Sequence, residues 1–444
     1  MKRNRLVLTV TSILLLCAVT FSFVGCAAQS ETETNKKAET QTETKEKAEV
    51  NKEPLSVTKK LSEGIRPNAV NANTLSPADN KKYTDFAVRL FKESEKSGEN
   101  TLISPLSVIY ALSMTANGAK GETLRQMEEV LGMSKDELNS YLFSYARALP
   151  QGDSYKLTLA NSVWFKDSGD FTVNEDFLQT NADYYGADIF KAGFDEQTLR
   201  DLNAWVNENT DGMIPKILDE IDPMSVMYLI NALTFDAKWE SIYYENEVFE
   251  SVFTREDGKT EKVELMDGSG NYYLEDENAV GFIKYYKGRN YAFAALLPDE
   301  GVSVSDYVAS LDGEKLYSIL TNLKKDQVLT KIPKFKTDYS VEMSEILESL
   351  GMKDAFVFNK ADFTGLGSSD MGNLYIGRVL HKTHIEVGEI GTKASAVTLV
   401  DVACGACPPP TSPKEVYLDR PFVYMLIDCK NNVPFFIGTV MSVE

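Results

Sequence analysis

Apolar residues in the first half of the chain recur at helical spacing. Ser104 and Pro105 are typical of a helix N-cap and a first helical position, because a serine oxygen can accept a backbone hydrogen bond and proline needs no donor there. The residues that follow at helical spacing are Leu106, Ile109, Tyr110, Ser113 and Met114. This pattern predicts a helix that starts at Pro105.

Two further segments carry helix signals. Ser134 and Glu137 have the spacing of a capping box, in which each side chain bonds the backbone N–H of the other residue, so a helix is expected after Ser134. An apolar stripe predicts another helix, which ends near Asp211–Gly212. This stripe consists of Leu199, Leu202, Trp205 and Val206.

The second half of the chain is richer in strand-like patterns. These cover residues 261–266, 280–298, 328–335, 374–388 and 415–441. Helices mixed with non-adjacent strands, without an internal repeat or βαβ alternation, predict a single α+β domain.

The N-terminus has the features of an export signal. Basic residues precede an apolar run from Leu6 to Val24, and a Gly-Cys step with two alanines ends the run at Cys26. The stretch from Phe23 to Cys26 resembles a bacterial lipobox, which implies that residues 1–25 are a signal peptide and that Cys26 is lipidated. A plain signal peptide or an uncleaved helix is the alternative, since the run is nearly long enough to span a bilayer.

Residues 26–70 are predicted to be a polar tether. From Ala27 onward, Glu, Lys, Thr, Ala and Gln dominate, and no aromatic residue occurs before Tyr83. Such a segment buries too little apolar surface to offset its ordering entropy. We expect a lipidated, flexible tether up to residue 70 and a folded domain at 71–444. The domain would then lie outside the cytoplasm at the cell surface, and only the N-terminal lipid would contact the membrane.

Composition and charge narrow the possible partners. Hydrophobic residues make up 43% of the 444 residues, as in a protein with a substantial core, and the net charge of −20 disfavours nucleic acid and anionic lipid. Two of the five cysteines, Cys17 and Cys26, belong to the export segment. The other three cannot form a disulfide framework for so large a domain, so core packing must stabilise it. They are Cys404, Cys407 and Cys429.

Catalytic chemistry finds little support in the sequence. The two histidines, His381 and His384, are three residues apart in a strand-like segment, so their side chains would point to opposite faces. A shared metal ion or a paired acid–base role is therefore not expected. The sequence contains no phosphate loop, zinc-protease helix motif or nucleophile elbow. We predict that the protein is not an enzyme and binds no metal or cofactor.

An unusual stretch runs from Glu389 to Pro413. Residues 389–400 follow a strand and are mostly small or β-branched, whereas residues 404–413 contain three consecutive prolines. Long connections without secondary structure tend to be functional or disordered. We expect an exposed loop whose first part can form a strand, and a proline-rich connection between two strands is the alternative.

Several separated motifs resemble the serpin family. Residues 389–398 resemble the family's hinge, residues 416–426 its C-terminal signature, and residues 231–240 the strand and turn that carry a tryptophan at the top of the main sheet. Further matches occur in the expected order at residues 104–107, 333–335, 350–352 and 361–365. The resemblance covers about residues 78–443. It implies an α+β serpin fold, in which helices pack around a large central sheet with smaller sheets and an exposed reactive-centre loop.

The resemblance implies a monomeric, irreversible suicide inhibitor of serine proteases. A protease would attack the loop and form an acyl-enzyme. The cut loop would then insert into the central sheet and trap the protease in this acyl-enzyme state. Gly391 would supply backbone freedom, and small side chains on one face would ease insertion. That face consists of Thr392, Ala394, Ala396 and Thr398. The assigned hinge residues are Glu389, Gly391, Thr392, Ala394, Ser395, Ala396, Val397 and Thr398.

The expected cut is the bond between Gly405 and Ala406. The stretch from Glu389 to Gly405 has 17 residues, the number that the family uses between hinge glutamate and scissile bond. Counting back from Glu415 would place the bond near Pro410–Thr411 instead. Small neutral residues at the cut suit an elastase-like or subtilisin-like serine protease, and a papain-like cysteine protease is the alternative.

Two more sets of residues carry hypotheses. Cys404 and Cys407 flank the expected cut, where a disulfide would tie its two sides together and prevent trapping; two unrelated small loop residues are the alternative. The resemblance also implies a buried hydrogen-bond cluster beneath the sheet opening, with a structural tryptophan at the insertion point. These residues are Ser104, Ser107, Asn231, His381 and Trp239.

Two hinge positions depart from the family pattern. Ile390 and Lys393 stand where acidic residues are common in the family, which could slow insertion and turn an inhibitor into a substrate. One alternative is therefore a non-inhibitory serpin that acts as a substrate decoy or binding module. Another is a lipoprotein that captures small ligands, which predicts two α/β lobes joined by a hinge.

Overall fold

A large sheet dominates the computed structural model, which describes residues 57–150, 152–167, 171–222, 225–368, 372–392 and 412–444. In these residues, the sheet has seven strands in the order β1-β5-β3-β6-β16-β15-β13. Their bounds, in the same order, are Lys59–Lys60, Asp188–Ala192, Tyr155–Lys166, Met227–Lys238, Gly391–Thr392, Arg378–Val387 and Phe335–Glu342.

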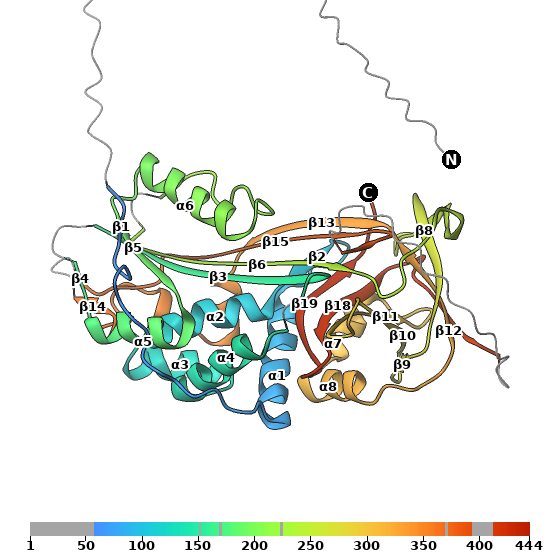
Figure 1. Ribbon diagram of the computed structural model, residues 1–444, viewed down its shortest axis with the longest axis horizontal. Coiled ribbons are helices and arrows are strands. Elements are labelled where there is room, and N and C mark those ends of the chain that lie inside the picture. The colour runs from blue at the N-terminus through green and yellow to red at the C-terminus, as the bar shows by residue number, and fades with distance from the viewer. Residues whose placement is uncertain (1–56, 151, 168–170, 223–224, 369–371, 393–411) are drawn as a thin grey trace, which may run out of the picture. The chain divides into compact units, whose positions relative to one another are not determined.

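Helices cover the two faces of this sheet unequally. Figure 1 shows α6 on one face, while α2, α3, α4 and α5 gather on the other. Their bounds are α2 Pro105–Ala116, α3 Gly121–Leu131, α4 Lys135–Ala148, α5 Glu175–Tyr185 and α6 Glu196–Asn209. The other described helices are α1 Pro77–Ser94, α7 Val304–Ser310, α8 Gly313–Thr321 and α9 Ser344–Leu350, with short turns η1 Glu245–Glu247 and η2 Asp354–Phe356.

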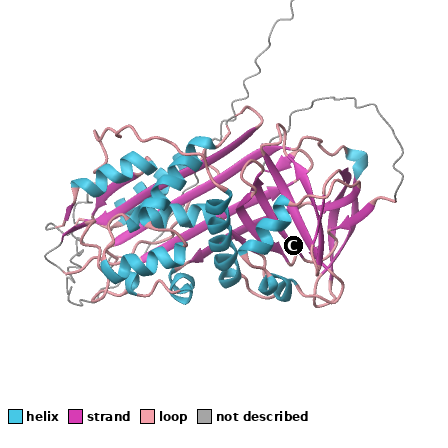
Figure 2. Ribbon diagram, turned by 90° about the horizontal axis from the view of Figure 1, so that it is seen from below, coloured by secondary structure: helices cyan, strands magenta, loops and turns pink. Residues whose placement is uncertain are grey.

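Smaller sheets complete the described structure (Figure 2). A six-stranded sheet has the order β2 Thr101–Ile103, β19 Val433–Val440, β18 Phe422–Asp428, β11 Tyr291–Pro298, β10 Ala279–Tyr285 and β9 Tyr273–Glu275. A four-stranded sheet has the order β17 Lys414–Tyr417, β12 Val328–Pro333, β8 Thr260–Gly270 and β7 Val248–Thr254. A two-stranded sheet pairs β14 Gly367–Ser368 with β4 Thr172–Val173. The predicted α+β arrangement, a large sheet with helices around it and smaller sheets, is confirmed.

Local capping signals place the helices where the sequence predicts them. The Ser104 side chain caps α2 by accepting from the Ser107 N–H, and Ser134 and Glu137 form the capping box of α4. The stripe of α6 packs against Tyr228 and other residues of the central sheet. All residues of α2 are buried, which agrees with the apolar residues that its own sequence carries on every side of the helix.

Some predicted strands divide further in the structure. Residues 280–298 form the hairpin of β10 and β11, whose turn contains Gly288 and Arg289 at positive φ. Residues 415–441 contain β17, β18 and β19, and the strand predicted at 374–388 starts only at Arg378. Periodicity alone does not mark these turns, because all the flanking residues are strand-like.

Residues 57–70 differ from the predicted tether, since they pack on the folded domain. β1 pairs with the edge strand β5, and the Leu61 N–H donates to the Ile189 carbonyl over 2.7 Å. Farther along, the Asn68 N–H and side chain donate to Asp183 of α5. These contacts use backbone and polar groups, so the composition of the segment does not reveal them.

We expect this edge segment to stabilise the domain. Deleting all residues before Pro67 should lower the free energy of unfolding by about 2–4 kcal/mol, because several hydrogen bonds of about 1 kcal/mol each are lost. Urea unfolding measures the change, and a chain that starts at Val57 is the control. Equal midpoints for the two truncated chains would show that the segment contributes nothing.

Candidate functional site: the opening of the central sheet

β6 and β15 are neighbours in the central sheet, but they pair directly at one end only. Residues Tyr228–Ile230 pair in parallel with Arg378–Leu380. At the other end β16 lies between the two strands and is antiparallel to both. Between these two places, the register of the described strands joins no residue of 231–235 to one of 381–386. The sheet therefore has an opening into which a further strand could pair.

Each of the two strands is held from its outer side. β3 pairs with β6 along its length, from Tyr155 opposite Ala237 to Phe165 opposite Met227. β13 likewise pairs with β15 from Phe335 to Glu342. The outer strands thus keep β6 and β15 in place although they do not pair along the opening.

The chain between β15 and β16 is fixed by backbone hydrogen bonds. The Trp239 N–H donates to the Ile390 carbonyl, and its indole N–H donates to the Gly388 carbonyl, both over 2.8 Å. The Tyr243 N–H donates to the Glu389 carbonyl over 2.9 Å. Three successive carbonyls are therefore held by the segment that follows β6, residues 239–243.

β16 fits between its neighbours because its residues are small. A Cβ atom on Gly391 would lie 2.0 Å from the Ala237 carbonyl oxygen, so close approach to β6 requires glycine there. This differs from the predicted role, which was backbone freedom. Thr392 is buried and its hydroxyl bonds that of Tyr286, whose ring stacks on Trp239 at 4.4 Å between centroids. The predicted inward orientation of Thr392 agrees with this burial.

Glu389 is anchored by charge. Its carboxylate lies 2.8 Å from Lys334 Nζ, which also contacts Glu264 at 2.8 Å. Partial burial works against the charged form of Glu389, but the hydrogen bond and charge of Lys334 outweigh it and lower the pKa of Glu389. The start of the hinge is therefore tied to Lys334, between β12 and β13, and through Lys334 to Glu264 of β8.

Four of the five residues assigned to the polar cluster come together beneath the opening. The Ser104 N–H donates to His381 Nε2 over 3.0 Å, and the Ser107 hydroxyl donates to Asn231. Asn231 in turn donates to Asn161 of β3, a residue that none of the sequence motifs contains. The four assigned side chains and that of Asn161 are all buried. Trp239 lies apart from them, at the hinge.

The two histidines face opposite sides of the sheet, as their spacing predicts. Burial lowers the pKa of His381 to about 3, so it is neutral, and its Nε2 accepts a hydrogen bond. On the other face, His384 Nδ1 lies 2.7 Å from the Asp338 carboxylate. His381 therefore holds α2 to β15 and is not suited to proton transfer at neutral pH.

The low pKa of His381 predicts a pH effect. The unfolded state binds the proton near the ordinary value of 6.5 and the folded state only near 3, so stability falls as pH drops below 6.5. Between pH 6.5 and pH 4.5 the loss is about 2–3 kcal/mol. His381→Gln should remove this loss from the change in unfolding free energy between pH 6.5 and pH 4.5 and so flatten the slope against pH, with His384→Gln as control. An unchanged slope would contradict a buried neutral His381.

Comparisons with known proteins give the family. The profile of the family described as serpin (serine protease inhibitor) matches residues 81–443. The chain belongs to the serpin family. Serpin B8 of Homo sapiens is 31% identical over 382 residues, which cover 80% of this chain and 97% of that protein. An uncharacterized serpin-like protein of Thermococcus kodakarensis is 28% identical over 390 residues, or 86% of this chain and 87% of that protein.

Solved serpin structures support the same assignment. Tengpin, a thermophilic serpin, is 50% identical, and its native state has a TM-score of 0.83 over 87% of this chain and 99% of Tengpin. Its latent state has a lower TM-score of 0.75 over 84% of this chain and all of the Tengpin chain. The serpin fold predicted from the resemblance is confirmed, and the alternative of two α/β lobes is wrong.

Part of the predicted site of this serpin lies outside the described residues. This holds for the rest of the hinge, the expected cut, the cysteine pair and the lipidation site: Ala394, Ser395, Ala396, Val397, Thr398, Cys404, Gly405, Ala406, Cys407 and Cys26. Cys429 is described, and burial raises the pKa of its thiol to about 12.

Two features are absent from the described residues of the serpin. No group of three or more His, Cys, Asp or Glu side chains in this part of the chain could hold a metal ion. None of the described helices is both long and apolar enough to cross a membrane.

Proposed function

We propose that this serpin is an irreversible suicide inhibitor of serine proteases. After cleavage, its reactive loop would insert between β6 and β15 and trap the acyl-enzyme. The observation that carries the proposal is β16: Gly391 and Thr392 already pair with β6 inside the opening, antiparallel to β6 as an inserting strand would be. The first pairs of the inserted strand are thus present before any cleavage.

If the inserted loop continued the register of β16, each residue that follows would have a defined neighbour on either side. Ala394 would come opposite Phe235 and Ile385, on the buried face that Thr392 occupies. Ala396 and Thr398 would follow on the same face, and Thr398 would reach the level of Asn231 and His381. Small side chains at these positions suit the limited space between two buried strands.

The same register offers a role for the unusual hinge residue Lys393. It would lie on the opposite face, at the level of Asp236 in β6 and Glu386 in β15. Two neighbouring carboxylates would favour a cation there. On this view Lys393 replaces the common acidic residue without hindering insertion.

The length of β6 supports a cut at Gly405. Continued in register, Val402 would come opposite Met227, the first residue of β6, so Gly405 would lie three residues beyond the end of that strand. The 12 residues of β6 span about 40 Å. A protease bound to Gly405 would therefore be carried to the far end of the sheet. A cut near Pro410 would leave a longer segment outside the sheet.

The energy balance favours insertion. The three direct pairs between β6 and β15 would have to separate. About ten loop residues would gain pairs on both sides at about 0.5–1.5 kcal/mol each, or on the order of 10 kcal/mol in total. The uncut state would then be metastable. That Tengpin has structures in a native and a latent state, and that this chain has the higher TM-score to the native one, is consistent with such a fold.

The target and the location complete the proposal. Gly405 and Ala406 would suit an elastase-like or subtilisin-like protease, and Cys26 would anchor the monomeric inhibitor to the membrane surface. Incubating the chain with a panel of serine proteases and one papain-like protease, followed by denaturing gels, tests the inhibitory function. A covalent complex that survives detergent is expected with at least one serine protease. Clean cleavage with full protease activity remaining would favour a substrate decoy, and a complex with the papain-like protease alone would favour the cysteine-protease alternative.

The cysteine pair adds a redox prediction. If Cys404 and Cys407 form a disulfide across the cut, the oxidised chain should trap protease at least about ten-fold more slowly than the reduced chain, because the inserting strand stays tied to the outer segment. The rate of complex formation with and without reductant measures this. Equal rates would dismiss the redox hypothesis, and Cys404→Ser should abolish any difference.

A further inference from the structure

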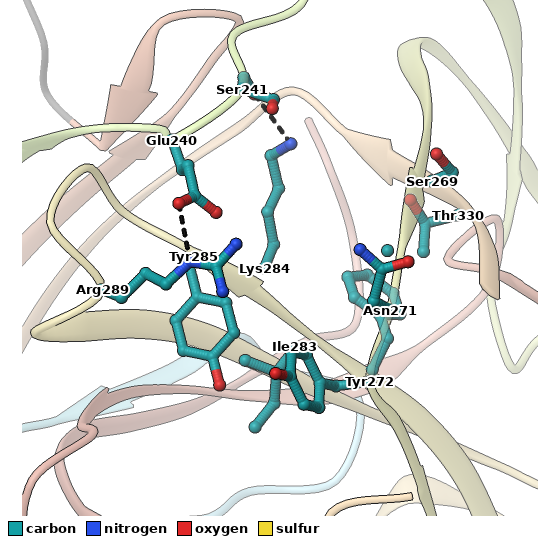
Figure 3. A pocket seen from close by; sticks show the side chains of 12 residues that line it. Glu240, Ser241, Ser269, Asn271, Tyr272, Ile283, Lys284, Tyr285, Arg289 and Thr330 are labelled. Atoms are coloured by element: carbon teal, nitrogen blue, oxygen red, sulfur yellow. Dashed lines mark hydrogen bonds and ion pairs between the residues drawn. The ribbon is translucent and has the colours of Figure 1, made fainter. Parts of the chain in front are cut away.

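Lys284 of β10 lies beside the segment that holds the hinge. Its Nζ donates to the Ser241 carbonyl over 3.0 Å, at the edge of a pocket that also contains Arg289 (Figure 3). The same Nζ lies 4.1 Å from the centroid of the Tyr243 ring and 5.4 Å from that of Trp239. Both distances are within the range of cation–π attraction.

Tyr243 and Trp239 are the residues whose N–H groups hold the hinge. They donate to the carbonyls of Glu389, Ile390 and Gly388. One short segment, residues 239–243, therefore contacts Lys284 through its rings and one carbonyl and the hinge through its N–H groups. A change at Lys284 should reach the hinge through this segment.

The charges around Lys284 are compatible with a cation. Burial lowers the pKa of Lys284 to about 8, although Glu247 and Glu240 favour its charged form, so the ammonium form predominates at pH 7. Glu240 also forms an ion pair with Arg289 at 2.7 Å (Figure 3). On the hinge side, Glu389 is paired with Lys334. The Lys284 ammonium group therefore contacts residues 239–243, while the nearby carboxylates of Glu240 and Glu389 are paired with Arg289 and Lys334.

We propose that Lys284 is a positioning residue for loop insertion: by holding Ser241, Tyr243 and Trp239 it keeps the hinge in register with β6. The importance of this register rests on the proposed inhibitory function, but the hold on the hinge does not. Neither the family motifs nor the hinge sequence points to Lys284, since it belongs to a different sheet.

Hydrogen exchange of the Trp239 and Tyr243 amides in the full chain at pH 7 tests the hold directly. Lys284→Gln should lower the protection of both amides about five-fold or more, because the cation is lost. Lys284→Arg keeps the charge and should retain at least half of the protection. Lys287→Gln is the matched control, since Lys287 is exposed three residues away and loses the same charge.

Amides of β3 and β6 near Val163 and Leu229 serve as the internal reference. Reduced protection at Trp239 and Tyr243 alone, restored by Lys284→Arg, supports the positioning role. Unchanged protection in Lys284→Gln, or an equal loss in Lys287→Gln, overturns it. Should Lys284→Gln fail to fold, Lys284→Met is measured against Lys284→Arg in the same way. Because no protease is involved, a chain that fails to trap proteases would leave this result intact.

Discussion

Cleavage of the reactive loop should raise the thermal unfolding midpoint of this serpin by about 10–15 °C. Insertion would add on the order of 10 kcal/mol of backbone pairing, and for a domain of this size such a gain corresponds to a shift of that order. Most proteins lose stability when a loop is cut. The expected increase follows from the opening between β6 and β15, where β16 already supplies the first pairs.

Limited proteolysis followed by calorimetry measures this shift. Mass spectrometry should first confirm that the cut lies within residues 393–411. A chain cut before Val57 provides the control, because that segment precedes β1 and should leave the midpoint unchanged. A loop-cleaved chain that unfolds at or below the temperature of the intact chain would mean that the loop does not enter the sheet.

Ala394→Arg should convert the inhibitor into a substrate. In the register of β16, residue 394 would lie between the buried side chains of Phe235 and Ile385, so a guanidinium there would have to be buried without a partner. That cost is several kcal/mol, which is enough to slow insertion more than ten-fold. The protease would then hydrolyse the acyl-enzyme before it is trapped. The ratio of cleaved to complexed chain on a denaturing gel measures the change.

Ser395→Arg is the matched control for this experiment. Residue 395 would lie on the opposite face, between Thr234, which is buried, and His384, which is partly exposed. The same substitution should therefore reduce trapping much less at 395 than at 394. Equal loss at both positions would argue against the register that β16 defines, while full trapping by both variants would argue against insertion along this path.

The sequence reveals most of what is determined locally. The ends of α2 and α4 follow from Ser104, Ser134 and Glu137, because a cap depends on residues three positions apart. The opposite orientation of the two histidines follows from the strand period. The family also emerges from the sequence, since its motifs are continuous stretches.

What the sequence does not reveal depends on contacts between distant segments. The opening arises because β6 and β15 pair only at Tyr228–Ile230, and no periodicity within either strand encodes that. Asn161 joins the buried cluster through its register with Asn231, which could have suggested it once β3 and β6 were known to pair. Lys284 contacts the segment that holds the hinge from the six-stranded sheet, and residues 57–70 use backbone groups that composition does not report.

Hydrogen exchange before and after loop cleavage tests insertion between β6 and β15 most directly. Half of the amides in residues 231–235 and 381–386 should point into the opening, where an inserted strand would supply their partners. We predict that cleavage raises the protection of these amides at least a hundred-fold, while amides between β3 and β6 change little. Unchanged exchange along both sides of the opening in a chain cut at Gly405 would contradict insertion.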